Sequence, residues 1–273
     1  MVLKKRVITA VLLGILVVGA VLCLATTVTA AVLGGFVLIA AWEWSGLIGW
    51  TNNRQKLAYS VLLALLAYCV WRWNESASLF SYLNIVALVS WLFATILVIV
   101  VHQQRMRCFA GIAASGVCGL VVLLPAWSGI VWLLENDTGM LLAFFTLIWV
   151  MDGMAFFVGK RWGKRRLASY VSPGKSWEGL VGGVGFGTIY AVAISSVMAL
   201  SDAAQFAFVL TAVAAMIASV IGDLFESMLK RRVGMKDSGR ILPGHGGVMD
   251  RIDGLVAATP IFVAGLYHWV NRL

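Results

Sequence analysis

The chain has 273 residues, of which 61% are hydrophobic and only 12% are charged. A soluble globular domain usually carries about twice that charged fraction, so the composition excludes a soluble enzyme and predicts an integral membrane protein. The net charge of +9 does not indicate nucleic-acid binding, because the basic segments lack the interleaved aromatic residues on which bases stack.

Apolar runs in the chain are long enough to predict about nine membrane-spanning helices, each of which needs roughly 20 apolar residues. They cover residues 7–24, 28–50, 57–71, 82–101, 109–134, 139–158, 179–200, 204–226 and 254–271. The third run is short, and Pro125 is expected to kink the fifth or to break it into a span and an interfacial piece. The predicted fold class is all-α, a polytopic integral membrane protein.

The connecting segments predict an orientation. If the N-terminus lies in the cytoplasm, the cytoplasmic segments are 1–6, 51–56, 102–108, 159–178 and 227–253. They contain every one of the 21 Lys and Arg residues except Arg72 and Arg272. Because cytoplasmic loops are enriched in Lys and Arg, we expect a multi-pass protein of the cell inner (cytoplasmic) membrane, with its N-terminus and longest loops in the cytoplasm.

The two halves of the chain differ in kind. Residues 1–135 have short loops and an almost acid-free set of spans, Glu43 being the exception, and are predicted to be a scaffold of N-terminal transmembrane helices. Residues 136–273 hold most of the twelve Asp and Glu residues and the two longest cytoplasmic loops, 159–178 and 227–253. We therefore expect the active site in the second half, at the cytoplasmic face.

Carboxylates near membrane depth are costly and mark candidate functional sites. Asp223 and Glu226 are spaced i, i+3 on one predicted helix face, Asp250 and Asp253 repeat that spacing, and Asp152 lies near the end of the sixth span. A single such acid is best explained by pairing with a nearby Lys or Arg. Five at one predicted membrane level favour a hard cation such as Mg²⁺, which prefers oxygen ligands.

The segment 227–253 has five glycines and one proline, so its backbone N–H groups can approach a phosphate closely. Its cations Lys230, Arg231, Lys236, Arg240 and Arg251 supply compensating charge. Together with the flanking acids, these features predict a site in which a metal bridges phosphates. His245 is either a phosphate donor or a plain loop residue.

The other loop ends in SPGKSWEG, residues 172–179, where Ser172, Lys175 and Ser176 are phosphate-binding candidates. An ordinary turn before a helix explains Pro173-Gly174 equally well. Beyond it, Gly179, Gly183 and Gly187 form a stripe of small residues that predicts close helix packing.

The chain has no GxSxG elbow, HExxH motif or Walker-type loop. A phosphate monoester that acts as the attacking nucleophile would need none of these motifs, because it already carries an anionic oxygen at neutral pH. Positioning and charge neutralisation would then supply most of the catalysis.

The run SMLKRRVGMKDSGRILPGHGGVMDRID, residues 227–253, resembles the signature of phosphatidate cytidylyltransferases, also called CDP-diacylglycerol synthases. SPGKSWEG and the Ile221-Gly222-Asp223 segment are similar to the same family, so the motif-level resemblance covers roughly 152–253. It implies a membrane-embedded nucleotidyltransferase that makes CDP-diacylglycerol and pyrophosphate for phospholipid biosynthesis. The implied partners are CTP, phosphatidic acid and the lipid bilayer, and a homodimer is one option for its assembly.

The resemblance also implies Mg²⁺ as cofactor, with K⁺ as a second cation, and places the metal ligands at Asp223 and Asp250. The implied catalytic positions are Asp223, Lys230, Lys236, Asp237, Asp250, Arg251 and Asp253. The implied substrate-binding positions are Ser172, Lys175, Ser176, Ser227, Arg231, His245, Gly246 and Gly247.

One segment departs from the family pattern. Where the family shows Asp, then Ser or Thr, then Gly-Ala-Tyr, this chain reads Asp152-Gly153-Met154-Ala155-Phe156. The missing hydroxyls leave open a catalytically weak paralogue, and a related CTP-dependent enzyme with another lipid acceptor also stays open. A transporter is disfavoured, because the acids cluster at helix ends and the two halves look unrelated.

Overall fold

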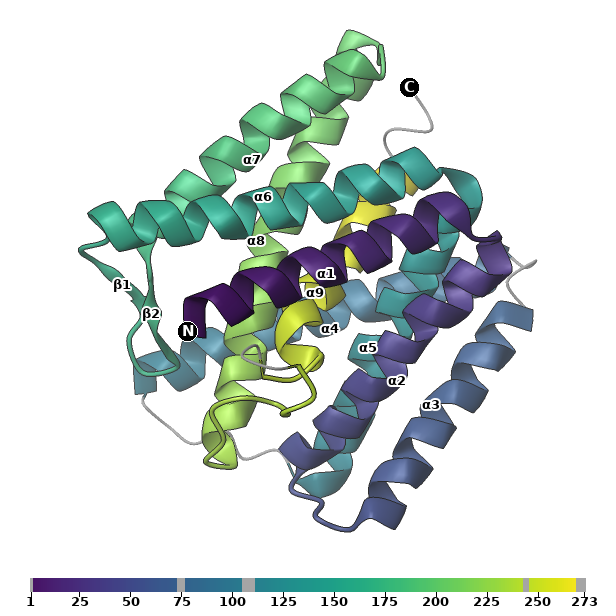
Figure 1. The fold of residues 1–273 in the computed structure, drawn as a ribbon, viewed down its shortest axis with the longest axis vertical. Coiled ribbons are helices and arrows are strands. Elements are labelled where there is room, and N and C mark those ends of the chain that lie inside the picture. Colours follow the sequence, from purple (N-terminus) through teal and green to yellow (C-terminus); the bar gives the residue numbers. More distant parts are fainter. Residues whose placement is uncertain (1, 73–76, 105–110, 243–245, 269–273) are drawn as a thin grey trace.

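The computed structural model describes residues 2–72, 77–104, 111–242 and 246–268 (Figure 1). These residues form long helices and one small hairpin. The elements are α1 (Val2–Cys23), α2 (Thr26–Ile48), α3 (Asn53–Arg72), α4 (Ala77–Gln104), α5 (Ile112–Asn136), α6 (Thr138–Trp162), β1 (Arg166–Ala168), β2 (Ser172–Ser176), α7 (Trp177–Val197), α8 (Asp202–Arg232) and α9 (Met249–His268).

The predicted helical, polytopic class is confirmed in its coarse form. Within the described part of the chain, six helices are long and apolar enough to cross a membrane, and they lie in α2, α4, α5, α6, α7 and α8. The count of nine spans and the side of the membrane on which the loops lie stay predictions.

Several predicted boundaries are corrected by the structure. Pro125 lies inside a continuous α5, so the predicted break of the fifth run into two pieces is wrong. The short third run belongs to a full helix, since α3 begins at Asn53. The predicted loop 227–253 is helical at both ends, because α8 continues to Arg232 and α9 begins at Met249.

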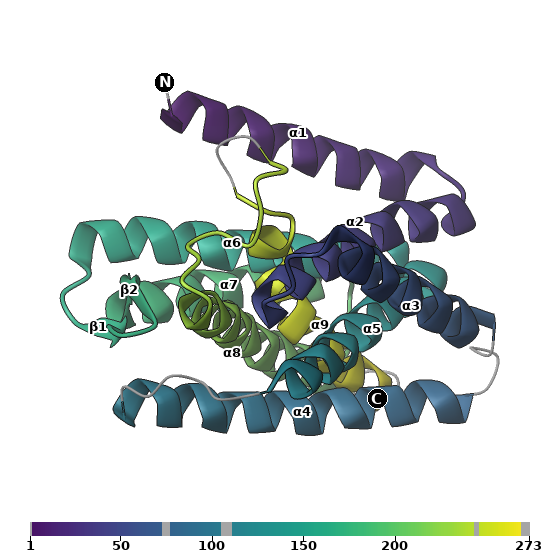
Figure 2. The ribbon, with the colours of Figure 1, turned by 90° about the horizontal axis from the view of Figure 1, so that it is seen from below.

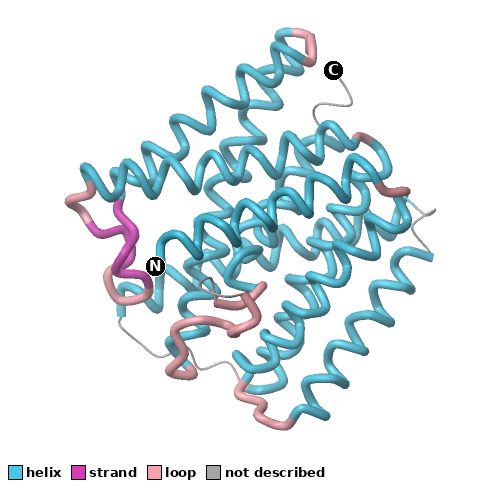
Figure 3. The backbone as a smooth tube through the Cα atoms, in the orientation of Figure 1, coloured by secondary structure: helices cyan, strands magenta, loops and turns pink. Residues whose placement is uncertain are grey.

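The second predicted loop, 159–178, is also partly ordered. Helix α6 continues to Trp162, and β1 and β2 then pair antiparallel, with Arg166 opposite Ser176 and Ala168 opposite Ser172. The hairpin lies at the junction of α6 and α7, and the longer irregular segment joins α8 to α9 (Figure 3). Ser176 therefore ends a strand rather than a simple turn, and its hydroxyl accepts a hydrogen bond from Gly179 N that caps α7.

The helices pack in layers, with α1 and α4 on opposite outer sides of the molecule (Figure 2). The α8–α9 segment extends from the inner helices toward the side on which α1 lies. The glycine stripe of α7 is confirmed as a packing surface: a Cβ at Gly183 would meet Met151 O at 2.7 Å, and one at Gly187 would collide with Met216. Small residues thus allow α6, α7 and α8 to approach closely.

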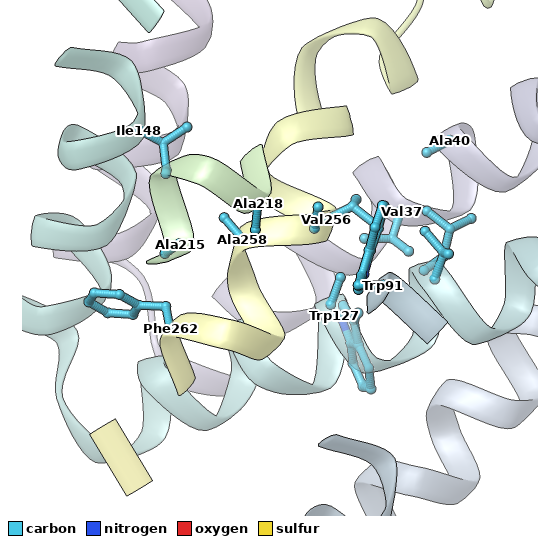
Figure 4. Packing of buried hydrophobic residues seen from close by; sticks show 14 of the residues in the cluster. Val37, Ala40, Trp91, Trp127, Ile148, Ala215, Ala218, Val256, Ala258 and Phe262 are labelled. Carbon is cyan, nitrogen blue, oxygen red and sulfur yellow. The ribbon is translucent and has the colours of Figure 1, made fainter. Parts of the chain in front are cut away.

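The centre of the bundle brings α8 and α9 together (Figure 4). Ala215 and Ala218 of α8 lie near Ala258 and Phe262 of α9, and all four are buried. A Cβ at Gly222 would collide with the carbonyl of Asp253, so the two backbones almost touch at that level. This close approach places the acids of α8 beside those of α9.

Candidate active site

A buried lysine joins the two helices where the apolar packing ends. Lys230 Nζ lies 2.5 Å from Glu226 Oε2, one turn earlier in α8, and 2.6 Å from Asp250 Oδ1 in the first turn of α9. The side chains are 10%, 1% and 5% exposed, respectively. Two carboxylates without this ammonium would be strongly disfavoured at such burial. Lys230, predicted as a catalytic cation, therefore also has a structural role.

A more open group of charges lies one helical turn away. Lys175 Nζ in β2 lies 2.6 Å from Asp223 Oδ2, and the Ser227 hydroxyl donates to Asp223 Oδ1 at 3.2 Å. The Asp223 side chain is 38% exposed, so a ligand can reach it. Asp152 of α6 interacts electrostatically with Lys175 and Asp223. The hairpin, α6 and α8 thus contribute charges to one place.

The remaining acid of the predicted set links the two groups. Asp253 interacts electrostatically with both Asp223 and Glu226, and one of its oxygens accepts a hydrogen bond from Gly254 N at 2.8 Å. Pairwise electrostatic interactions therefore connect Asp152, Asp223, Glu226, Asp250 and Asp253 into one chain of neighbouring charges.

Asp250 also anchors the segment between α8 and α9. Its Oδ2 accepts hydrogen bonds from Gly247 N at 2.8 Å and from Ser238 N at 2.9 Å. Burial raises the pKa of the Asp250 carboxyl, but the Lys230 ammonium and these two N–H groups outweigh burial and hold the pKa below its ordinary value. The carboxylate stays ionised and joins two points of the loop, Ser238 and Gly247.

A residue of the first half completes the loop anchor, and its role was missed in the sequence. Glu43 of α2 is 4% exposed, and its Oε2 accepts hydrogen bonds from Met249 N at 2.7 Å and from the Ser238 hydroxyl at 3.1 Å. The only sequence signal was a lone carboxylate in an apolar run of residues 1–135. Its partners, more than 190 positions away, could not be read from spacing.

Three loop glycines make this arrangement sterically feasible. A Cβ at Gly239 or Gly247 would collide with the Glu43 carboxylate. Gly246 adopts φ +81°, a left-handed conformation that disfavours side chains with a Cβ. Gly246 and Gly247 were predicted to bind substrate; in this structure they let the loop fold tightly around Glu43 and Asp250.

The other predicted residues lie around these anchors. Arg231, Lys236 and Asp237 are exposed, so their side chains are accessible to a polar ligand. Ser172 is half-buried in the hairpin, whereas Ser176 is buried where it caps α7. Arg251 is exposed and interacts with Asp152. The predicted residue His245 lies outside the described residues.

This constellation suits the handling of phosphates. Half-buried Lys175 stands beside the accessible carboxylate of Asp223, and a glycine-bearing loop is fixed by buried ion pairs and hydrogen bonds. Such a site can neutralise and orient phosphoryl groups without a separate nucleophilic side chain.

Comparison with known proteins agrees with this chemistry. The profile of the Cytidylyltransferase family matches residues 4–269. The chain is 39% identical over 269 residues to a phosphatidate cytidylyltransferase of Pseudomonas aeruginosa, covering 97% of each chain. It is 33% identical to the Haemophilus influenzae protein of that name, covering 95% of this chain and 97% of the relative, and 30% identical to one from Brucella abortus, covering 86% and 89%. The chain therefore belongs to the cytidylyltransferase family.

Proposed function

We propose that the chain is a phosphatidate cytidylyltransferase, which converts CTP and phosphatidic acid into CDP-diacylglycerol and pyrophosphate. The names of its full-length relatives support this activity. The observation that carries the proposal is the meeting of Lys175 from the hairpin with Asp223 of α8, one turn from the ion pairs of Lys230. Charged groups from separate elements thereby form one phosphate-handling site at the end of apolar helices.

In the proposed reaction, an anionic oxygen of the lipid phosphate attacks the α-phosphorus of CTP. A new oxygen–phosphorus bond forms, the bond to the β-phosphate bridge breaks, and pyrophosphate leaves. The exposed cations Lys236 and Arg251 neutralise charge on the phosphates, and Arg231 and Ser227 contribute to substrate binding. Lys230 fixes the carboxylates of Glu226 and Asp250, and Asp250 in turn holds the α8–α9 segment in one arrangement.

Of the two proposed ligands, Asp223 fits Mg²⁺ better, because its side chain is 38% exposed and an ion could take the place of Lys175 beside it. The Asp250 carboxylate is 5% exposed, and both of its oxygens are already held, by Lys230 and by the N–H groups of Ser238 and Gly247. Within the described residues, no group of three or more Asp, Glu, His or Cys side chains forms a metal site by itself. Mg²⁺ commonly binds through one or two carboxylates together with substrate phosphates, which suits this arrangement. When bound, the ion would polarise the phosphates; K⁺ is proposed as a second cation.

The site is proposed to face the cytoplasm from the inner membrane of a bacterial cell. The relatives are bacterial proteins, and six described helices can span a membrane. The positive charge of both loops supports the cytoplasmic side. Labelling of single cysteines placed at Lys164 and at Lys236 should succeed with a membrane-impermeant reagent only in inverted vesicles; labelling in intact cells would refute this orientation.

Purified protein in detergent, supplied with labelled CTP, Mg²⁺ and phosphatidic acid, should form lipid-linked CMP and release pyrophosphate. Asp250→Asn should abolish turnover while the protein remains folded; normal turnover by this variant would remove Asp250 from the mechanism. Absence of product with phosphatidic acid would contradict the proposed acceptor, and product from another lipid phosphate would identify the alternative one. No product with any lipid acceptor would favour a catalytically weak paralogue.

A further inference from the structure

A cavity of about 450 Å³ lies between α1 and the body of the bundle. Its wall is mainly apolar and includes Val11, Gly14 and Val17 of α1, Phe36 of α2, Trp149 of α6 and Leu255 of α9. Val11 and Trp149 are 53% and 40% exposed, so the cavity reaches the apolar surface of the molecule. Its size falls within the range of about 300–1,000 Å³ that is usual for small-molecule sites.

One end of this cavity is charged. Asp152 and Arg251 line it, together with Leu242 of the α8–α9 segment. Asp152 interacts electrostatically with Arg251, Lys175 and Asp223, so the charged end lies beside the charges of the active site. A second cavity of about 400 Å³, between α2, α3 and α5, has no charged side chain among its described lining residues. The α1 cavity thus combines an apolar wall with charged side chains at one end, which the cavity between α2, α3 and α5 does not.

We propose that this groove binds an acyl chain of the lipid substrate, with the lipid phosphate at the Arg251 end. The inference rests on the proposed function and adds the place where the lipid tail is held. The anionic phosphate of phosphatidate suits the Arg251 end of the groove. Its hydrocarbon chain suits the apolar wall along the rest of the groove. The length of acyl chain that fits in the groove then sets how many methylene groups contribute to lipid binding.

Gly14 offers a direct test, because a Cβ built there meets nothing within 4 Å and the residue lines the groove. Gly14→Trp should fill the groove. Gly19→Trp is the matched control: Gly19 is on the same helix, is half-buried and has equally open space, but is not part of the groove wall. Both variants and the wild type are assayed with dioleoyl phosphatidate in mixed micelles and with water-soluble dihexanoyl phosphatidate.

Gly14→Trp should lower kcat/KM for the dioleoyl substrate at least roughly tenfold, since excluding two methylene groups from an apolar site already has that effect. The dihexanoyl substrate should be nearly unaffected, and Gly19→Trp should behave as the wild type with both. Equal losses with the two substrates, equal losses in the two variants, or no loss would each overturn the inference. If the wild type formed no CDP-diacylglycerol from either substrate, the proposed function itself would fail.

A second measurement needs no variant. Wild-type protein is irradiated with phosphatidate whose acyl chain carries a diazirine, and the labelled peptides are identified. Labelling that includes the peptides of Gly14 or Trp149, and that excess unlabelled phosphatidate removes, is the expected result. Labelling spread over all lipid-facing helices and unaffected by competitor would show that the groove holds only bulk lipid, against the inference.

Discussion

The carboxylate of Glu43 accepts a hydrogen bond of 2.7 Å from the backbone N–H of Met249, across 206 positions of the chain. It also accepts one from the hydroxyl of Ser238, so a single buried acid of α2 holds two points of the α8–α9 segment. The helices of residues 1–135 therefore do more than support the second half, because one of them fixes the loop that carries the signature residues.

Glu43→Leu should leave the N–H of Met249 and the hydroxyl of Ser238 without their buried acceptor, at a cost of about 1–3 kcal/mol for each. Turnover should fall strongly, because the loop loses its fixed arrangement. Glu43→Gln retains one acceptor oxygen and should keep more of both stability and activity. Thermal unfolding and CDP-diacylglycerol formation are measured in the same detergent. The exposed Glu135 provides a control, and an effect of Glu135→Gln as large as that of Glu43→Leu would contradict this role.

Gly247→Ala should disturb the same anchor from the loop side. The added Cβ would collide with the Glu43 carboxylate and with the Ser238 hydroxyl, and overpacking of this kind costs about 1–3 kcal/mol. Gly174→Ala in the hairpin is the matched control, since a Cβ there meets nothing within 4 Å. We expect a lower unfolding temperature and reduced turnover for Gly247→Ala alone. Equal unfolding temperatures for the two variants would show that the loop can shift without loss.

Lys230→Met should destabilise the protein by about 3–5 kcal/mol, because it leaves the buried carboxylates of Glu226 and Asp250 without their counter-charge. Lys236→Met removes an exposed cation of the same loop and should lower turnover with little change in stability. Unfolding temperature and kcat/KM, measured for both variants, separate the structural effect from the catalytic one. Unchanged stability in Lys230→Met would refute the role of this lysine as the link between α8 and α9.

Removal of divalent cations with EDTA should stop turnover, and added Mg²⁺ should restore it, because the proposed ion neutralises the triphosphate of CTP. Asp223→Asn should raise the Mg²⁺ concentration needed for half-maximal activity. Lys164→Met, which alters an exposed cation of the other loop, should leave that concentration unchanged. Full activity in EDTA would refute metal dependence, and an unchanged Mg²⁺ requirement in Asp223→Asn would remove this residue from the ion's ligands.

The sequence predicted the helical membrane class because long apolar runs have few stable alternatives in lipid. Spacing also predicted that Asp223 and Glu226 share a helix face, since the helical period is local. The glycine stripe of α7 was predicted for the same reason. By contrast, the helical ends of the loop 227–253 and the intact α5 around Pro125 differ from prediction, because tertiary packing overrides the local preferences of polar and proline residues.

By itself, the sequence determined which residues carry charge and which helices can enter lipid. Only the tertiary structure decided their partners: Lys175 with Asp223, Lys230 between Glu226 and Asp250, and Glu43 with the loop. The reason is physical. Charge type and hydrophobicity are properties of single residues and short windows, whereas a hydrogen bond or ion pair depends on which helix surfaces come together, and these surfaces are fixed by close packing at positions such as Gly222.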